Sequence, residues 1–321
     1  MLADLNSPIF QDDDVARDWL EQQIWPAGPT CSHCGSFGEG VTRMFGTGGV
    51  KGTKHRPGCF QCNACRGQFT VTTGTVMERS HIPLHIWLKA MYLLSASKKG
   101  MSTHQLHRML GVSLKSTWFL MHRIREAMRE PYFAKMGGRG SSVQADETFI
   151  GRTTTRAGER RRRGYQEKEP VLTLVDEDTK KARSFHRPEV NAATLKPILK
   201  EQIDAASWLM TDDASYYDPV GQDYRRHFTV NHSIGEYVSG GTTTNACENY
   251  FSILKRAING VYQHVSATHL KRYVGEFDFR YNNRVGLGTD DMGRTEKVAK
   301  GAAGKRLTYR STRRQPEAET P

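Results

Sequence analysis

Five of the six cysteines fall between Cys31 and Cys65, and their spacing points to metal chemistry. Cys31 and Cys34 form one Cys-x-x-Cys knuckle, and Cys62 and Cys65 form a second one. Four thiolates from two such knuckles can close a tetrahedron around Zn²⁺. The binding energy of the metal then substitutes for a hydrophobic core that so small a segment cannot build. We therefore predict a zinc ribbon within residues 1–75; a set of reduced structural cysteines is the simpler alternative.

The second knuckle can be read in two ways, because Cys59 and Cys62 have the same spacing as Cys62 and Cys65. We favour Cys62 and Cys65, since Phe60 and Phe69 then flank the knuckle in a hairpin that packs aromatic rings over the metal. In this interpretation Cys59 is a spare thiol. The alternative, in which Cys59 replaces Cys65 as the fourth ligand, stays open at this point.

Two acidic side chains in strand-like segments form a second candidate site. Asp146 lies in the middle of one such segment, and Asp212 ends another. An acid in such a position is costly unless it is paired, exposed or bound to a metal. Strand side chains alternate between the two faces of a sheet. We therefore expect only one of Asp146 and Glu147 at the site, and the same choice arises for Asp212 and Asp213.

The order of the surrounding elements suggests how these acids could meet. The pattern predicts strands at 142–150, 171–175, 182–186, 207–212 and 224–231, with a helix at 191–204 and a further helix before the last strand. This is the order of an α/β fold, a ribonuclease H-like mixed sheet with flanking helices. In that fold the first strand lies beside the strand that follows the first helix. Asp146 and Asp212 would then be neighbours at one end of the sheet.

Residues 242–284 predict two helices joined by a short loop. Glu248 and Lys255 are seven residues apart in the first helix, close to two turns, so both side chains should face the same way. Apolar residues recur at helical spacing in the second helix, which should pack on the sheet. These residues are Leu270, Tyr273, Val274 and Phe277. Basic residues of the same segment, including Arg280, could face a nucleic acid or only the solvent.

Between the ribbon and the sheet, residues 76–135 predict a helix-turn-helix. Ser102 can cap a first helix, Gly111 can turn the chain, and a second helix follows from residue 115 to residue 129. In helix-turn-helix proteins the second helix enters the major groove of DNA. The residues offered to a groove would include Lys115, Ser116, Thr117 and Arg123. An ordinary helical hairpin is the alternative.

The charge balance favours a polyanionic partner. The chain has 46 Lys and Arg against 34 Asp and Glu, a formal net charge of +12 and a sequence pI near 9.5. The run Arg160–Arg163 should stand in a loop between the first two strands, where it could contact phosphates. No apolar run approaches the length of about 18 residues typical of a membrane span. The N-terminus lacks the pattern of a signal peptide, so we expect a cytoplasmic protein.

Five motifs carry a family resemblance. In chain order they are WPAGPTCSHCGS, FQCNACRGQFTVTTGT, ADETFIG, LMTDDASYY and TNACENYFSILKRAINGVYQHVSATHLKRYVGEFDFRYNNR. Together they resemble the bacterial insertion-sequence transposases of the DDE class, in the subgroup with an N-terminal zinc ribbon. The motifs extend over nearly the whole chain from Trp25 to Arg284, and the last is the most specific.

The resemblance implies that Asp146, Asp212 and Glu248 are the catalytic carboxylates, and that Lys255 holds a phosphate or a terminal base of DNA. Carboxylate oxygens suit Mg²⁺ or Mn²⁺ rather than the Zn²⁺ of the cysteines, so we expect two separate metal sites. By analogy, water first cuts at the transposon end, and the freed 3′ hydroxyl then attacks target DNA.

The third carboxylate has rivals. Some relatives carry asparagine at that position, and Asn245 and Asn249 flank Glu248 on the same predicted helix. We favour Glu248 because it stands 36 positions after Asp212 and because the basic residue typical of the family, Lys255, follows it at the expected distance.

The resemblance also implies the partners and the function. The protein would bind double-stranded DNA at the terminal repeats and at the target, act as a dimer or larger assembly, and associate with the nucleoid in the cytoplasm. An inactive DNA-binding regulator descended from a transposase, and a nuclease of the same fold, are the alternatives. The expected domains are a ribbon at 1–75, a helix-turn-helix at 76–135, a catalytic domain at 141–290 and a flexible basic tail at 291–321.

Overall fold

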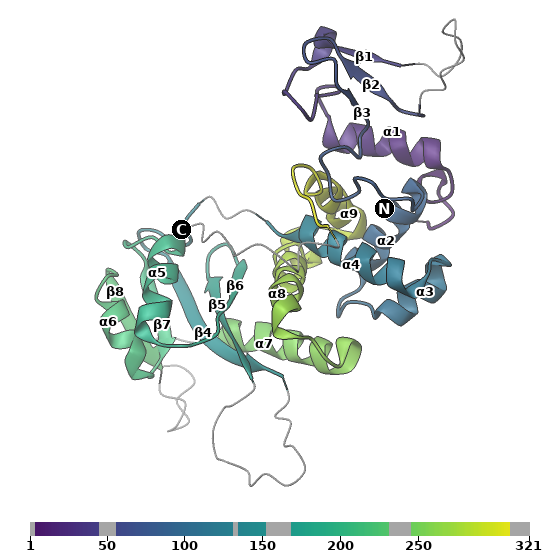
Figure 1. Ribbon diagram of the computed structural model, residues 1–321. Helices are drawn as coiled ribbons and strands as arrows, with labels where there is room; N and C mark the ends of the chain where they lie inside the picture. Colours follow the sequence, from purple (N-terminus) through teal and green to yellow (C-terminus); the bar gives the residue numbers. More distant parts are fainter. Residues whose placement is uncertain (1–3, 45–55, 131–133, 152–167, 231–244, 309–321) are drawn as a thin grey trace, which may run out of the picture. The chain divides into compact units, whose positions relative to one another are not determined.

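The computed structural model describes residues 4–44, 56–130, 134–151, 168–230 and 245–308 (Figure 1). The chain forms two compact units. One unit combines Met1–Arg129 with Thr289–Pro321, and the other consists of Glu130–Gly288. The second unit is therefore inserted into the first, because the chain leaves the first unit after Arg129 and returns to it at Thr289.

The first unit contains a small ribbon next to helix α1. The ribbon is an antiparallel sheet in the order β1-β2-β3. The elements are α1 (Asp13–Ile24), β1 (Val41–Arg43), β2 (Phe60–Cys62) and β3 (Gln68–Phe69). Trp25 packs edge-on against Phe60 and Phe69, with ring centroids 5.5 and 5.7 Å apart. The two phenylalanines share a small core with Cys31 and Cys62, which confirms the predicted aromatic packing beside the knuckles.

Four further α-helices belong to the described part of the first unit. They are α2 (Leu84–Ala96), α3 (Thr103–Leu110), α4 (Leu114–Met128) and α9 (Asp291–Lys300). Apolar residues fall on most sides of α2, which buries Trp87, Leu88, Met91 and Leu94. This burial is possible because α1, α3, α4 and α9 all pack against α2. A helix that is apolar on most sides thus forms the centre of the unit.

Helix α9 corrects one expectation from the sequence. Composition predicted a flexible tail over residues 291–321, but the first ten of these residues form α9. The helix buries Val298 and Ala299, and its Arg294 side chain donates a hydrogen bond to the backbone carbonyl oxygen of Ser95 at 2.8 Å. The helix has few apolar residues, so its periodicity was too weak to predict it; its stability comes from packing in the unit.

The second unit is built on a five-stranded mixed sheet in the order β6-β5-β4-β7-β8 (Figure 1). The strands are β4 (Ser142–Ile150), β5 (Glu169–Asp176), β6 (Ala182–His186), β7 (Trp208–Asp212) and β8 (Arg226–Val230). β5 runs antiparallel to β4 and β6, whereas β7 runs parallel to β4 and β8. The first strand therefore lies beside the fourth, as predicted, and the fold is ribonuclease H-like.

Helices cover both faces of this sheet. They are α5 (Ala192–Gln202), α6 (Asp218–Gly221), α7 (Asn245–Ala257) and α8 (Ala267–Asn282). Val143 and Ala145 of β4 share one core with α5 and α6, whereas Ile150 shares the other core with α7 and α8. Odd-numbered β4 side chains therefore leave the strand toward α5, and even-numbered ones toward α7. None of the helices in the described ranges has the length and apolar character needed to cross a bilayer.

Helix α8 packs as the sequence predicted, with one exception. The four predicted apolar residues are all buried: Leu270, Tyr273, Val274 and Phe277. Arg280, however, cannot face a nucleic acid, because it is only 8% exposed and its guanidinium pairs with the fully buried Glu276. A basic residue at the edge of an apolar stripe could not be told from a surface residue by spacing alone.

Candidate functional site

Asp146 and Asp212 lie side by side on neighbouring strands. The parallel pairing of β4 with β7 ends with Gln144 opposite Met210. Two residues further along each strand, the same register places Asp146 level with Asp212. Even-numbered β4 side chains face α7, so both aspartates point to that side of the sheet. One carboxylate oxygen from each lies within 4.8 Å of the other. The structure thus brings together the two acids that the strand order made neighbours.

Glu147 joins this cluster, which corrects the expectation that only one of the two adjacent acids could do so. One of its carboxylate oxygens also lies within 4.8 Å of the oxygens of Asp146 and Asp212. Its side chain leaves β4 toward the opposite face. The pairing with β7 has already ended at this level, so nothing in the ladder separates the tip of this long side chain from the end of β7. Alternation along a strand predicts the face from which a side chain leaves the backbone. It does not predict where the carboxylate of a long side chain such as glutamate lies.

Two tyrosines hold Glu147 in place. Tyr216 and Tyr217 lie in the short 3₁₀ helix η3 (Ser215–Tyr217), which follows β7. Their hydroxyls donate hydrogen bonds to the two carboxylate oxygens of Glu147, at 3.2 and 2.5 Å. Glu147 therefore ties β4 to the turn just after Asp212. Sequence reasoning missed this role; the tyrosines stood in the LMTDDASYY motif, but their spacing did not say which acid they would meet.

Burial and like charges raise the pKa of both acids on β4. The pKa of Asp146 rises to about 7, mainly because the group is buried and then because the charges of Asp212 and Glu248 lie near it. The hydrogen bond from the backbone N–H of Glu147 and the positive charge of Lys255 lower this pKa and so partly offset the rise. Burial likewise raises the pKa of Glu147 to about 8. Carboxylates crowded in this way repel one another until an opposite charge joins them. A divalent cation would supply that charge, so the donor set fits Mg²⁺ or Mn²⁺.

Helix α7 carries Glu248 and Lys255 on one flank. Its buried side consists of Cys247, Tyr250, Phe251, Leu254 and Ala257. At 3.6 residues per turn, Glu248 and Lys255 differ by only about 20° around the helix. Asn245 lies nearly opposite the buried side, and Asn249 lies about 100° around the helix from Glu248. Both flank charges act on Asp146, so this flank lies toward the cluster. Glu248 is not among the acids that approach one another within 4.8 Å in the described part of the chain.

The four cysteines favoured as zinc ligands come together in the ribbon. The Sγ atoms of Cys31, Cys34, Cys62 and Cys65 lie within 4.8 Å of one another. Cys31 is 3.7 Å from Cys65, and Cys34 is 3.5 Å from Cys62. Cys59 is buried but does not belong to this group. Four thiols at such distances form the closed donor set typical of structural Zn²⁺.

Backbone N–H groups prepare these sulfurs for a metal. The N–H of Cys65 donates to Cys62 Sγ at 3.5 Å, and the N–H of His33 donates to Cys31 Sγ at 3.4 Å. Hydrogen bonds, chiefly the one from the N–H of Cys65 and then that from the Cys34 side chain, outweigh burial and lower the pKa of Cys62 to about 6. The thiolate is the form that binds zinc. The residues present therefore fit a Zn²⁺ ion in both number and chemistry.

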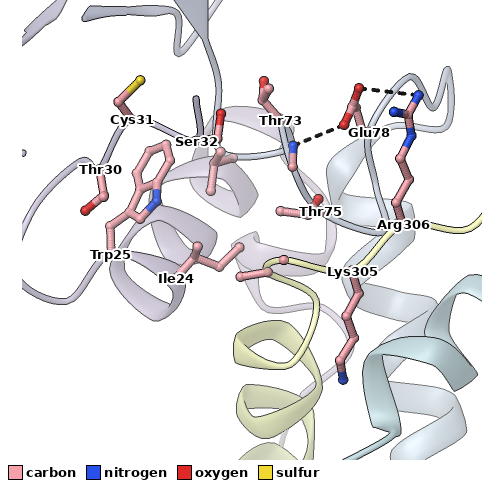
Figure 2. Close-up of a pocket in the computed structure, with 14 residues that line it drawn as sticks. Ile24, Trp25, Thr30, Cys31, Ser32, Thr73, Thr75, Glu78, Lys305 and Arg306 are labelled. Atoms are coloured by element: carbon pink, nitrogen blue, oxygen red, sulfur yellow. Dashed lines mark hydrogen bonds and ion pairs between the residues drawn. The ribbon is translucent and has the colours of Figure 1, made fainter. Parts of the chain in front are cut away.

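A cleft of about 590 Å³ lies beside the ribbon, within the first unit (Figure 2). Glu78 accepts a hydrogen bond from the N–H of Gly74 at 3.2 Å and pairs with Arg306 at 3.8 Å. Lys305 points away from the cleft, and its ammonium donates to a carbonyl oxygen at the end of α4 (Figure 2). The charged groups of the cleft are therefore engaged in contacts within the first unit, whereas the carboxylate cluster belongs to the second unit.

Helices α3 and α4 follow each other across a turn at Gly111, in the order predicted for a helix-turn-helix. The Ser102 hydroxyl accepts a hydrogen bond from the third residue of α3, as expected for a cap. Gly111 ends α3 with a φ of 66°, a left-handed conformation that suits glycine. Ser113 then caps α4. Lys115 and Ser116 at the start of α4 are exposed, so they could reach a groove.

The other two groove residues predicted on α4 are not available to DNA. Thr117 is fully buried, and its hydroxyl donates to the carbonyl oxygens of Val112 and Ser113. Arg123 donates to the carbonyl oxygens of Leu307 at 3.2 Å and Glu78 at 3.1 Å. Both predictions are therefore wrong. The Arg160–Arg163 run, and the tail beyond residue 308, lie outside the described residues.

Comparison with known proteins matches both candidate sites. Residues 137–282 match the ISXO2-like transposase domain, a range that contains the carboxylate cluster and α7. Residues 11–68 match the transposase zinc-ribbon domain, a range that contains the four cysteines. The two domains define a transposase with a ribbon in front of its catalytic fold. The chain belongs to the insertion-sequence transposases of the DDE class that carry an N-terminal zinc ribbon.

The proteins similar to this chain include two relatives and the solved structure of an integrase domain. An uncharacterised protein in transposable element ISH50 of Halobacterium salinarum is 27% identical over 286 residues, which cover 84% of this chain and 91% of that protein. An uncharacterised transposase-like protein of Haemophilus influenzae is 29% identical over 96 residues, 30% of this chain and 76% of that protein. The HTLV-2 integrase catalytic core domain in complex with magnesium is 10% identical, with a TM-score of 0.26, over 44% of this chain and 86% of that chain.

Proposed function

We propose that this protein binds the ends of an insertion sequence and catalyses divalent-metal-dependent cleavage and joining of phosphodiester bonds. One observation carries the proposal. Asp146 and Asp212 stand level on adjacent parallel strands, with their carboxylate oxygens within 4.8 Å, on the side of the sheet that α7 covers. Half-buried strand acids gathered in this way are costly unless they are paired or bind a cation, so a metal-dependent reaction best explains their presence.

The metal ligands we propose are Asp146, Asp212 and Glu248, holding Mg²⁺ or Mn²⁺. A divalent cation held by these residues would supply charge that activates the attacking oxygen and stabilises the leaving oxygen of a phosphodiester. Glu248 stands on the flank of α7 whose charges act on Asp146. We assign Glu147 to a different task, because both of its carboxylate oxygens already accept tyrosine hydroxyls. It holds η3, and hence the end of β7, in position.

Lys255 is proposed to hold DNA rather than metal. It is exposed near the end of α7, nearly two turns from Glu248 and on the same flank. A lysine at this place can meet a phosphate next to the bond being cut, which would position the strand against the carboxylates. Its positive charge also opposes the mutual repulsion of the acids, as its effect on Asp146 indicates.

Recognition of double-stranded DNA is proposed for the first unit. The zinc ribbon and the exposed start of α4, with Lys115 and Ser116, would contact the terminal repeats. The net charge of +12 favours such a polyanion. Because two ends must meet before an element can move, we propose a homodimer or a larger assembly on DNA. The protein would work in the cytoplasm, associated with the nucleoid.

The test uses purified full-length protein and duplexes made from the DNA that flanks its coding region. Wild type with Mg²⁺ or Mn²⁺ should cut at the element end and join that end to a second duplex. Asp146→Asn and Asp212→Asn should bind end DNA normally but lose cleavage by roughly 10²- to 10³-fold or more, because they remove charge stabilisation at the reacting centre. Asp213→Asn is the matched control, since Asp213 is exposed and outside the cluster.

The products separate this proposal from its rivals. A nuclease of the same fold would cut end DNA without ever joining it. An inactive regulator would bind end DNA without metal-dependent cleavage. Unimpaired cleavage by Asp146→Asn would show that the carboxylate cluster is not the reaction site.

A further inference from the structure

Gln144 makes hydrogen bonds that join three elements around the carboxylate cluster. It lies on β4, is 1% exposed and faces the α7 side of the sheet, two residues before Asp146. Its side-chain oxygen accepts hydrogen bonds from the backbone N–H groups of Ala246 at 3.0 Å and Cys247 at 3.3 Å. Its side-chain nitrogen donates to Glu177, on the turn after β5, at 2.5 Å. A single side chain thus contacts β4, α7 and the β5–β6 turn.

The bonds to α7 satisfy groups that the helix itself leaves unpaired. The first backbone N–H groups of an α-helix have no partner within the helix. A side chain just before the helix usually supplies the acceptor. Here a glutamine from the central strand does so, and its amide offers both the acceptor for α7 and the donor for Glu177. In a buried setting such bonds are strong and directional, so they fix where α7 begins relative to the sheet.

This geometry links two of the proposed metal ligands. Cys247, whose backbone N–H is one of the two donors, is next to Glu248, and Gln144 is two residues from Asp146. The Cys247 thiol also donates to the carbonyl oxygen of Thr173 at 3.7 Å, a second tie between the start of α7 and the sheet. Glu248 is exposed on its flank of α7, and its backbone position in the first turn of α7 decides where its carboxylate can reach.

We propose that Gln144 is the positioning residue that sets Glu248 against Asp146 and Asp212, an inference that rests on the proposed function. Gln144 does not touch the reacting atoms; it acts by holding the N-terminus of α7. If it served only general packing, its removal would cost stability alone. A positioning role predicts, in addition, weaker metal binding at the carboxylates and a loosened first turn of α7.

The main test is Gln144→Leu in the full-length protein, which keeps the bulk but removes the hydrogen bonds. Cleavage of end DNA is measured against Mn²⁺ concentration, and backbone hydrogen exchange is measured over residues 245–257. Loss of groups that orient metal ligands typically costs 10- to 100-fold in metal affinity or activity, and we expect about that loss here. Exchange at Ala246 and Cys247 should become faster, while the zinc content stays at the wild-type level.

Thr173→Val is the matched control for the loss of a buried polar group. Thr173 is fully buried on the adjacent strand β5, and its hydroxyl bonds to that of Ser184 at 3.0 Å. This variant should retain the wild-type dependence on Mn²⁺. An equal loss in Thr173→Val and Gln144→Leu would overturn the proposal, as would a Gln144→Leu protein with wild-type metal dependence.

A charge-preserving exchange covers the case in which Gln144→Leu fails to fold. In the double variant Gln144→Glu with Glu177→Gln, the carboxylate at position 144 can accept hydrogen bonds from the two backbone N–H groups of α7. It can also accept one from the amide nitrogen at position 177. All three hydrogen bonds are kept, and only the donor of the bond between positions 144 and 177 changes sides. The single Gln144→Glu variant instead places two carboxylates in contact. The double variant should recover cleavage and the single one should not; equal activity in both would overturn the proposal.

The hydrogen-exchange result separates this inference from the proposed function. If wild type never cleaves DNA but Gln144→Leu still loosens the first turn of α7, the proposed function fails and the positioning of α7 stands. If wild type cleaves and Gln144→Leu leaves the exchange at Ala246 and Cys247 unchanged, the inference about Gln144 is wrong and the proposed function stands.

Discussion

The thiolate cluster of the ribbon and the carboxylate cluster of the sheet are built in opposite ways. The four cysteines come from two short knuckles beside strands of two or three residues, with a core of only a few side chains. Asp146 and Asp212 are 66 positions apart and meet only because a well-packed sheet brings their strands together. A site with so little core depends on its metal for its shape, whereas the sheet holds its acids in place before any metal arrives.

Removal of zinc should therefore have the largest effect. Cys62→Ser should abolish zinc binding, unfold the ribbon and eliminate specific binding of end DNA, because a structural zinc contributes on the order of 10 kcal/mol. Metal analysis should show one zinc per wild-type chain and none in the variant. Cys59→Ser is the matched control, since Cys59 lies outside the cluster. Loss of zinc in this control would show that our assignment of the zinc ligands is wrong.

Binding of Mg²⁺ or Mn²⁺ at the carboxylates should stabilise the folded protein less than zinc does. A ligand present at a hundredfold excess over its Kd stabilises the folded state by about 2.7 kcal/mol. Mg²⁺ or Mn²⁺ should therefore raise the Tm of wild type and of Asp213→Asn, but not that of Asp146→Asn. Thermal unfolding with and without the cation measures this difference. If the second unit unfolds when Mg²⁺ is withdrawn, the contrast between the two sites disappears.

The smallest effects should come from two basic residues of α4, one bonded to distant backbone segments and the other exposed to solvent. Arg123→Ala should lower the stability of the first unit by about 1–3 kcal/mol, because two carbonyl oxygens from distant segments lose their donor. Lys115→Ala should leave the Tm unchanged and reduce the slope of DNA affinity against salt by about one. The opposite pattern, with Lys115 affecting stability and Arg123 only DNA affinity, would reverse our assignment of these two residues.

The sequence predicted what depends on local spacing or on strand order. The paired knuckles identified the thiol set, with Cys65 favoured over Cys59. The order of apolar runs identified the ribonuclease H-like sheet, and with it the neighbourhood of Asp146 and Asp212. Both signals are strong because few other folds would produce them. One is the two-residue spacing within each cysteine pair, and the other is the order of the strands and helices along the chain.

The sequence did not predict which partners the polar ends of long side chains would contact. Alternation along β4 placed Glu147 on the face opposite Asp146 but did not predict that its carboxylate reaches the cluster, because alternation ignores how far a glutamate extends past the end of a neighbouring strand. Gln144 gave no signal at all, since a glutamine in an apolar run has no fixed partner. Arg123 and Arg280 were read as surface charges, although distant backbone or a buried acid holds each of them. Such partners are brought together only by the tertiary fold.

The insertion of the second unit makes it a cassette with two attachments. Its two ends lie close together, because Asn283 donates a hydrogen bond to Glu130 at 3.1 Å. One break in the backbone between the units leaves them covalently joined, and only two breaks release the cassette. Exchange of residues 130–288 between relatives would therefore replace the proposed catalytic unit in one piece, while α9 and the residues before 130, to which we assign DNA recognition, stay unchanged.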